Sequence, residues 1–269
     1  MVKNKDAKRF VKDAYGKIAQ GEKGCGCDSC CGGQDTKGFA RSIGYSEEEL
    51  RVIPDEANLA LGCGNPTALA GIKEGEAVLD LGAGAGFDAF LAAARVGPQG
   101  KVIGVDMTPE MINKARENAA KTSADNVEFR LGEIERLPVA DSSVDVVISN
   151  CVINLSSDKP GVFREICRVL KPGGRIAISD IALIKELPAK IRESIDAYVG
   201  CVGGAILVDE YACIVRQAGL KDVRVTVKGS SACIDPKTKD PIGRAILDGL
   251  PRGASLQDYV TSVYVEARK

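Results

Sequence analysis

The chain has 269 residues, of which 45 % are hydrophobic and 27 % charged, and its net charge at pH 7 is −1. These proportions are typical of a soluble globular protein, and a net charge near zero creates no field that would attract nucleic acid or an anionic membrane. No apolar run reaches the roughly 20 residues that a membrane-spanning helix requires, and the N-terminus lacks an apolar signal-peptide core. The sequence therefore predicts a cytoplasmic protein without nucleic-acid or membrane partners.

The chain contains ten cysteines and no histidine. In a reducing compartment, clustered cysteines indicate metal binding or thiol chemistry more often than structural disulfides. The absence of histidine excludes the commonest general base and any site built on imidazole. Because thiolates prefer soft ions, this composition points to a thiolate-rich site for a soft metal or metalloid.

The first part of the chain is predicted to be an extension that carries a cysteine cluster. Residues 1–24 hold an excess of Lys and Arg, with Phe10, Val11, Ala14 and Ile18 near helical spacing, which favours a solvated amphipathic helix. The segment 24–33, GCGCDSCCGG, predicts a loop with Cys25, Cys27, Cys30 and Cys31. Ser46 and Glu49 form a capping box at the start of a short helix.

From residue 76 onwards, strand and helix patterns alternate. Strands are expected at 76–82, 101–106, 126–132, 143–150 and 174–183, and helices at 86–97, 109–121 and 159–170. Such alternation predicts an α/β fold with a parallel sheet, helices on both faces and right-handed crossovers. Beyond residue 184 we expect helices at 188–200 and 207–220, a strand at 221–229, an irregular stretch at 229–257 and a final alternating strand at 259–269.

A glycine-rich loop follows the first strand of this pattern. Gly82, Gly84 and Gly86 permit a tight turn and close approach of a ligand, and Asp106 ends the second strand, where its carboxylate can accept hydrogen bonds from a ribose. The spacing G-x-G-x-G differs from the dinucleotide fingerprint. Asp80, beside the loop, would repel a pyrophosphate but suits the ammonium or sulfonium of S-adenosylmethionine.

The motifs VLDLGAGAG, GVDMTPEM, RLGEIERLPVADSSVDVVISN and RVLKPGGR resemble those of class I methyltransferases. The resemblance implies a Rossmann-like, mostly parallel sheet in which an antiparallel last strand lies beside the fifth. It also implies that S-adenosylmethionine binds at the loop with its methionyl part near Asp80 and its ribose near Asp106. The further cofactor-binding residues implied are Met107, Glu133 and Ile134 around the adenine, together with Asn150 at the end of the fourth strand.

Three cysteines lie close to the expected site. Cys151 directly follows the fourth strand, where an open α/β sheet holds its ligands, while Cys63 and Cys201 lie in glycine-rich turns. Cys167 and Cys213 fall among apolar helical residues and are expected in the core.

The segments GCGNP, NCVINL and CVGGA, together with GVDMTPEM, resemble arsenite methyltransferases over residues 58–220. The resemblance implies that Cys63, Cys151 and Cys201 bind arsenic and take part in turnover. It also implies that a further N-terminal cysteine takes part in turnover. Cys30 and Cys31 are the candidates, and we predict that Cys31 is the catalytic one. The crowded cluster leaves room for a metalloid-loading or zinc site.

These observations predict an enzyme that transfers a methyl group from S-adenosylmethionine to thiol-bound trivalent arsenic. Its partners would be arsenite as a thiol complex and a thiol reductant such as thioredoxin or a small thiol. The expected parts are residues 1–57 (extension), 58–184 (cofactor-binding core) and 185–269 (acceptor part completing the sheet). Two alternatives are a C-methyltransferase of a quinone precursor and a non-enzymatic metalloid- or zinc-binding protein.

Overall fold

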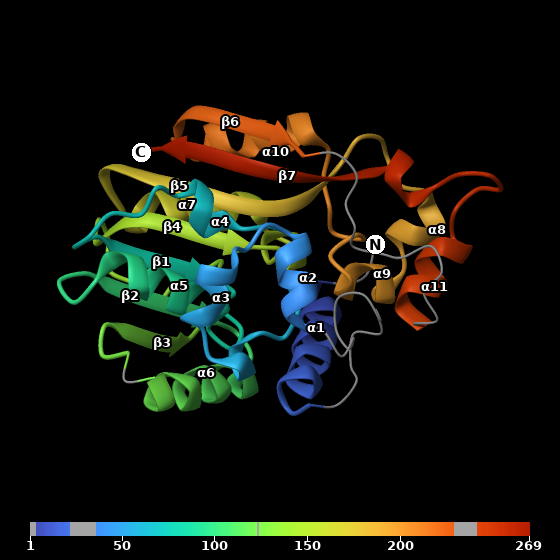
Figure 1. The fold of residues 1–269 in the computed structure, drawn as a ribbon. Coiled ribbons are helices and arrows are strands. Elements are labelled where there is room, and N and C mark those ends of the chain that lie inside the picture. The colour runs from blue at the N-terminus through green and yellow to red at the C-terminus, as the bar shows by residue number, and fades with distance from the viewer. Residues whose placement is uncertain (1–3, 22–35, 123, 229–240) are drawn as a thin grey trace.

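A seven-stranded mixed sheet forms the centre of the molecule (Figure 1). The computed structural model describes residues 4–21, 36–122, 124–228 and 241–269. The strand order is β3-β2-β1-β4-β5-β7-β6. The strands are β1 (Ala77–Leu81), β2 (Lys101–Asp106), β3 (Val127–Leu131), β4 (Val144–Asn150), β5 (Leu170–Leu183), β6 (Lys221–Val227) and β7 (Val260–Arg268).

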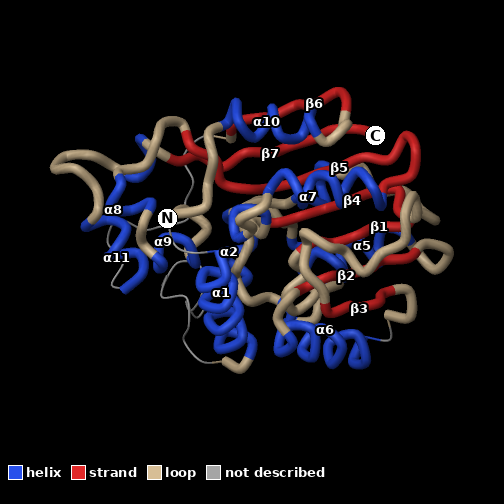
Figure 2. Tube along the Cα trace, turned by 180° about the vertical axis from the view of Figure 1, so that it is seen from behind, coloured by secondary structure: helices blue, strands red, loops and turns tan. Residues whose placement is uncertain are grey.

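The pairing of the strands confirms the expected topology. Strands β1 to β5 pair in parallel, whereas β7 pairs antiparallel with β5 and with β6. Consecutive residues of β1 enter different cores: Val78 packs with α5 (Phe87–Val96) and α6 (Pro109–Thr122), and Leu79 packs with α7 (Lys159–Val169) and α10 (Val208–Gln217). Both faces are therefore buried, as expected for parallel strands that alternate with helices. Figure 2 shows the opposite side of the sheet, where α7 and α10 cover the face that contains Leu79.

The remaining helices are short, apart from the first. They are α1 (Asn4–Ala19), α2 (Thr36–Ser42), α3 (Glu47–Arg51), α4 (Pro66–Leu69), α8 (Ala189–Arg192), α9 (Ile195–Val199) and α11 (Pro241–Asp248), with 3-10 turns η1 (Asp55–Ala57), η2 (Ile153–Leu155) and η3 (Leu256–Asp258). The capping box of Ser46 and Glu49 at the start of α3 is confirmed. Helices α1, α2, α8, α9 and α11 gather beyond the carboxyl ends of the parallel strands (Figure 1).

Three expected elements differ in the structure. The single helix expected at 188–200 is broken into α8 and α9, because the hydroxyl of Ser194 caps the backbone N–H of Ala197 and starts a new helix. The stretch 229–257, which was expected to be irregular, contains α11 in its described part. Strand β5 begins at Leu170, which pairs with Val144 ahead of a bulge.

Helix α1 is amphipathic, but it is not an isolated solvated helix. Its Val11 and Ile18 are 1 % and 7 % exposed, and the helix packs against α6 and α9. Burial of this apolar face places α1 over the carboxyl ends of the strands, where it contributes to the site described below. In the described part of the chain, no helix is both long and apolar enough to cross a membrane.

Candidate active site

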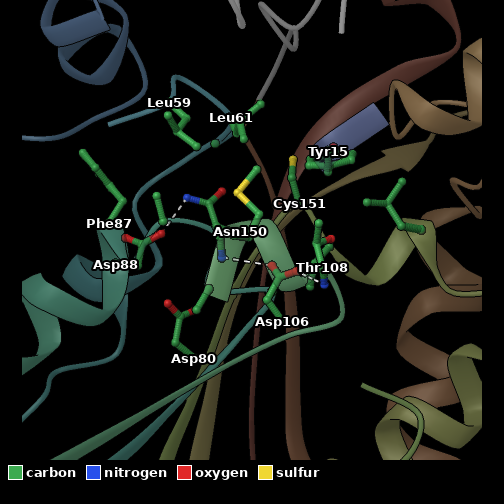
Figure 3. A pocket seen from close by; sticks show the side chains of 18 of the residues that line it. Tyr15, Leu59, Leu61, Asp80, Phe87, Asp88, Asp106, Thr108, Asn150 and Cys151 are labelled. Atoms are coloured by element: carbon green, nitrogen blue, oxygen red, sulfur yellow. Dashed lines mark hydrogen bonds between the residues drawn. The ribbon is translucent and has the colours of Figure 1, made fainter. Parts of the chain in front are cut away.

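A pocket lies beyond the carboxyl ends of β1, β2 and β4, with α1 and α2 forming part of its wall (Figure 3). The expected cofactor residues that line it are Asp80, Gly82, Gly84, Asp106, Met107, Ile134 and Asn150. Cys151 lines it as well, directly after Asn150. The topology thus brings together the glycine loop, the end of β2 and Cys151, one of the cysteines expected to bind the acceptor.

The glycine loop has the left-handed backbone that its sequence suggests. Gly82, Gly84 and Gly86 have φ angles of 68°, 53° and 98°. A Cβ on Gly86 would lie 2.6 Å from the ring of Phe90, so this glycine is required for the packing of α5. Gly86 is not among the residues that line the pocket, whereas Gly82 and Gly84 are. Two glycines of the loop therefore line the pocket, and the third allows the loop to pack against the core.

Asp106 holds the glycine loop against the end of β2. Its carboxylate accepts hydrogen bonds from the backbone N–H groups of Gly84 (3.0 Å) and Thr108 (2.8 Å), one at each oxygen. A carboxylate has about four acceptor positions, so each oxygen keeps capacity for a further donor such as a ribose hydroxyl. Burial raises the pKa of Asp106, and the backbone hydrogen bonds oppose this rise.

Asp80 lies at the floor of the pocket. It is 2 % exposed, and its Oδ2 has no hydrogen-bond partner among the described residues. Burial, together with the negative charges of Asp88 and Asp106, raises the pKa of Asp80 well above its usual range. A buried oxygen without a partner is uncommon and costly, and a cationic ligand would relieve both its lost solvation and the repulsion. These residues therefore fit the ammonium or sulfonium of S-adenosylmethionine.

Asn150 connects the pocket to the turn that carries Cys63. Its amide nitrogen donates to Asp88 Oδ2 at 3.0 Å (Figure 3), and its oxygen accepts the backbone N–H of Cys63 at 2.9 Å. The hydroxyl of Tyr45 donates to the other oxygen of Asp88 at 2.7 Å. Burial raises the pKa of Asp88 to about 6, although both hydrogen bonds oppose the rise. Tyr45 and Asp88 could not be selected from the sequence, since neither belongs to a recognisable motif.

The side of the pocket expected to hold adenine contains only part of the expected set. Met107 and Ile134 line the pocket, whereas Glu133 does not. Glu133 is an exposed residue whose carboxylate pairs with Lys8 of α1 at 2.8 Å. Glu135 lines the pocket instead, and it contacts the same Lys8 at 3.1 Å.

Cys63, Cys151 and Cys201 share one buried cluster, with exposed fractions of 9 %, 8 % and 7 %. Cys63 and Cys151 form a disulfide whose Cα atoms are 6.0 Å apart, and the thiol of Cys201 donates to the carbonyl oxygen of Cys151 at 3.1 Å. In this oxidised form, no three Cys, Asp or Glu side chains of the described residues are arranged to hold a metal ion. The fourth expected residue, Cys31, lies outside the described residues together with the rest of its cluster.

The backbone at two of these cysteines is unusual. Cys151 and Cys201 have φ angles of 60° and 63°, in the left-handed region that residues with a Cβ rarely adopt. Such conformations cost free energy and are concentrated at functional sites. Both strained residues lie where two turns, 50 residues apart in the sequence, contact each other through the hydrogen bond from the Cys201 thiol to the Cys151 carbonyl.

Helix α1 contributes a residue to the pocket that no sequence motif indicates. Tyr15 lines the pocket, and its hydroxyl lies 3.9 Å from the Cys201 sulfur. Burial raises the pKa of Tyr15 well above its usual range, so the phenol keeps its proton. Tyr15 thus lines the pocket and also contacts Cys201.

The two helical cysteines expected in the core lie nearer the surface. Cys167 in α7 is half-buried and Cys213 in α10 is exposed. The expectation for Cys213 was wrong, because the buried side of α10 is formed by Tyr211, Ala212 and Val215.

Comparison with known proteins agrees with this geometry. Residues 72–219 match a model described as a methyltransferase domain. The chain is 44 % identical to an arsenite methyltransferase of Halobacterium salinarum, over 98 % of this chain and 67 % of that protein. It is 34 % identical to an arsenite methyltransferase of Aquipseudomonas alcaligenes, over 87 % and 68 %. The crystal structure of an arsenic(III) S-adenosylmethionine methyltransferase from Chlamydomonas reinhardtii covers 86 % of this chain and 72 % of its own, with 33 % identity and a TM-score of 0.58.

Proposed function

The chain belongs to the arsenite methyltransferase family, and we propose that it transfers a methyl group from S-adenosylmethionine to trivalent arsenic held by its cysteine thiolates. The observation that carries the proposal is the meeting of Cys63, Cys151 and Cys201 in one buried cluster, with Cys151 on the wall of the pocket that contains Asp80. A C-methyltransferase of a quinone precursor would need no such group of thiols, and a non-enzymatic binding protein would need no glycine loop.

The cofactor would be held by residues with distinct tasks. Asp80 would face the cationic part, Asp106 the ribose, and Met107 and Ile134 the adenine, with Asn150 supporting the wall beside Asp88. When bound, S-adenosylmethionine supplies a methyl group on a sulfonium, an electrophile that suits the lone pair of trivalent arsenic. Glu133 retains at most a peripheral role, because its carboxylate faces Lys8.

The protein's own contribution is binding and orientation. Cysteine thiolates replace the oxygens of arsenite and hold the arsenic in a pyramid with its lone pair exposed. Arsenic loses no proton on methylation, so no general base is required, in agreement with a chain that lacks histidine. Orientation of two reactants can supply roughly 7–11 kcal/mol of the barrier reduction.

The Cys63–Cys151 disulfide supports a need for an external thiol reductant. While that bond is intact, neither Cys63 nor Cys151 can supply a thiolate to arsenic. Thioredoxin or a small thiol would restore the ligands by thiol–disulfide exchange. Cys31 remains a proposed further participant in this exchange or in arsenite capture.

The experiment that tests the function is incubation of the reduced protein with arsenite and labelled S-adenosylmethionine, followed by arsenic speciation. Methylated arsenic should form with the wild type. Cys151→Ser and Cys201→Ser should abolish it, while Cys167→Ser, which changes a half-buried cysteine of α7, should retain it. Arsenite binding without any methylated product would show a binding protein rather than an enzyme.

A further inference from the structure

The turns that carry Cys151 and Cys201 are joined by a side chain as well as by the thiol hydrogen bond. The hydroxyl of Tyr198 donates to the carbonyl oxygen of Leu155 at 2.9 Å. Tyr198 lies in α9, three residues before Cys201, and Leu155 ends the 3-10 turn η2, four residues after Cys151. The hydrogen bond therefore connects the two acceptor turns at a point away from the sulfurs.

We propose that Tyr198 is a positioning residue for arsenic binding, because its hydroxyl fixes the turn of Cys201 relative to the turn of Cys151 and so sets the separation of the two sulfurs. The proposal rests on the proposed function, in which these cysteines hold arsenic together. Tyr198 does not contact the arsenic in this scheme; it acts through the two turns.

Backbone hydrogen bonds connect each partner of the Tyr198–Leu155 hydrogen bond to the turn of one cysteine. The backbone N–H of Cys201 donates to the carbonyl of Tyr198 at 3.0 Å, so the ring and the thiol belong to one turn. On the other side, the N–H of Leu155 donates to the carbonyl of Val152 at 3.0 Å, which closes the turn directly after Cys151. A displacement of the hydroxyl would therefore be transmitted to the sulfurs.

Two glycines after Cys201 are required by close contacts. A Cβ on Gly204 would overlap the carbonyl oxygen of Asn154 in the other turn, whereas one on Gly203 would lie 2.7 Å from the backbone nitrogen of Tyr198 in the turn of Cys201 itself. Asn154 cannot retreat easily, because its amide donates to Asp180 at 2.9 Å inside the core. Gly204 is thus required by the contact between the turns, and Gly203 by the compact shape of the Cys201 turn, independently of the thiols.

The chemical consequence differs between ligands that need two thiols and reagents that need one. Trivalent arsenic bonded to two sulfurs requires both at a fixed separation, and small losses of orientation are costly in such arrangements. Alkylation of a single thiol has no such requirement. Loss of the Tyr198 hydroxyl should therefore weaken the binding of arsenicals without changing the reactivity of either cysteine.

The test uses the full-length reduced protein carrying Cys63→Ser, so that Cys63 cannot pair with Cys151. The probe is phenylarsine oxide, which binds two thiols, in excess over the protein. After incubation, iodoacetamide alkylates the unprotected cysteines, and peptide mass spectrometry reads Cys151 and Cys201 separately. The phenylarsine oxide concentration that gives half-protection of both cysteines is compared among this parent, Tyr198→Phe and Tyr259→Phe.

Tyr198→Phe should raise the half-protection concentration roughly tenfold, the effect of losing about one hydrogen bond, with unchanged alkylation rates when no arsenical is present. The control Tyr259→Phe removes a hydroxyl from the same apolar cluster, where the ring packs under Lys185, and should match the parent within about twofold. A Tyr198→Phe curve that coincides with the parent's would overturn the inference. Absence of joint protection in the parent itself would instead contradict the proposed function.

Discussion

The side-chain oxygen of Asn150 accepts a hydrogen bond from the backbone N–H of Cys63 at 2.9 Å. The amide of the same residue donates to Asp88 at the pocket wall, at 3.0 Å. Asn150 ends β4, so one side chain at a strand end joins the proposed cofactor pocket to the proposed arsenic ligand. The cysteine turn is therefore supported by the sheet even when its disulfide is reduced.

Asn150→Ala should lower the free energy of unfolding by about 1–3 kcal/mol, because it leaves buried hydrogen-bonding groups without a partner. It should also reduce arsenite methylation. The control is Asn126→Ala, since Asn126 donates to the carbonyls of Ala93 and Gly97, both at 2.9 Å, away from the pocket. The control should lose similar stability in urea unfolding and keep its activity. Equal loss of activity in both variants would mean that only global stability is affected.

The disulfide predicts how the cysteines respond to a thiol reagent. In unreduced wild-type protein, iodoacetamide should leave Cys151 unmodified, because its sulfur is bonded to Cys63. In unreduced Cys63→Ser, Cys151 should become modified, while the reaction of Cys167 stays the same in both proteins. Peptide mass spectrometry gives each extent of modification. If Cys151 remained unmodified in Cys63→Ser, the bond to Cys63 would not be what protects it.

Asp106→Asn should weaken S-adenosylmethionine binding by about 1.5–3 kcal/mol, the range for a charged hydrogen-bond acceptor. The substitution keeps the size of the side chain but removes the charge and one acceptor oxygen. The control is Asp145→Asn, which changes a carboxylate that accepts the N–H of Ala77 at 2.9 Å, at the start of β1. Calorimetric titration should show normal affinity for the control. Unchanged affinity in Asp106→Asn would remove Asp106 from the cofactor site.

Much of this site could be predicted because strand ends fix position. Asp80, Asp106 and Cys151 lie at or just beyond the ends of parallel strands, and parallel strands bring their carboxyl ends to one edge. Hydrophobic patterning located those strands to within a few residues. The glycine loop could be predicted for the same reason, since it directly follows β1.

The parts that could not be predicted depend on how separate elements pack. Tyr15 reaches Cys201 only because α1 packs over the strand ends, and helical periodicity does not show where a helix packs. Glu133 and Glu135 are two residues apart, and a short irregular segment gives no period from which to decide which one faces the pocket. Cys213 follows two buried residues of α10 but faces outward, a difference of one position around the helix.

The buried carboxyl of Asp180 predicts a pH-dependent stability. Asp180 is fully buried between the amide of Asn154 and the hydroxyl of Tyr211, and burial raises its pKa to about 7. Between its unfolded pKa, near 3.9, and about 7, the folded state binds more protons than the unfolded state, so stability falls as pH rises.

Asp180→Asn should remove this dependence. The slope due to Asp180 is at most about 1.4 kcal/mol per pH unit, and its contribution becomes constant above pH 7. Urea unfolding from pH 4 to 8 should show the variant gaining stability relative to wild type as pH rises through this window. Parallel curves for the two proteins would contradict the raised pKa. The charge of Lys159, which opposes the rise in the pKa of Asp180, is present in both proteins.

The left-handed backbone of Cys201 predicts that glycine is more stable than alanine at this position, the reverse of the order expected inside a helix. At a φ of 63°, alanine keeps the clash of its Cβ, whereas glycine does not. Cys201→Gly should therefore be more stable than Cys201→Ala by roughly 0.5–1 kcal/mol, as measured by urea unfolding in reducing buffer. Both variants lack the sulfur, so the comparison isolates the effect of the backbone.

The same two substitutions at Cys167, inside α7, should give the opposite order of stability by about 1 kcal/mol, since glycine weakens a helix. If alanine were the more stable residue at both positions, the turn of Cys201 would not be strained, and the thiol would need no special backbone to reach Cys151.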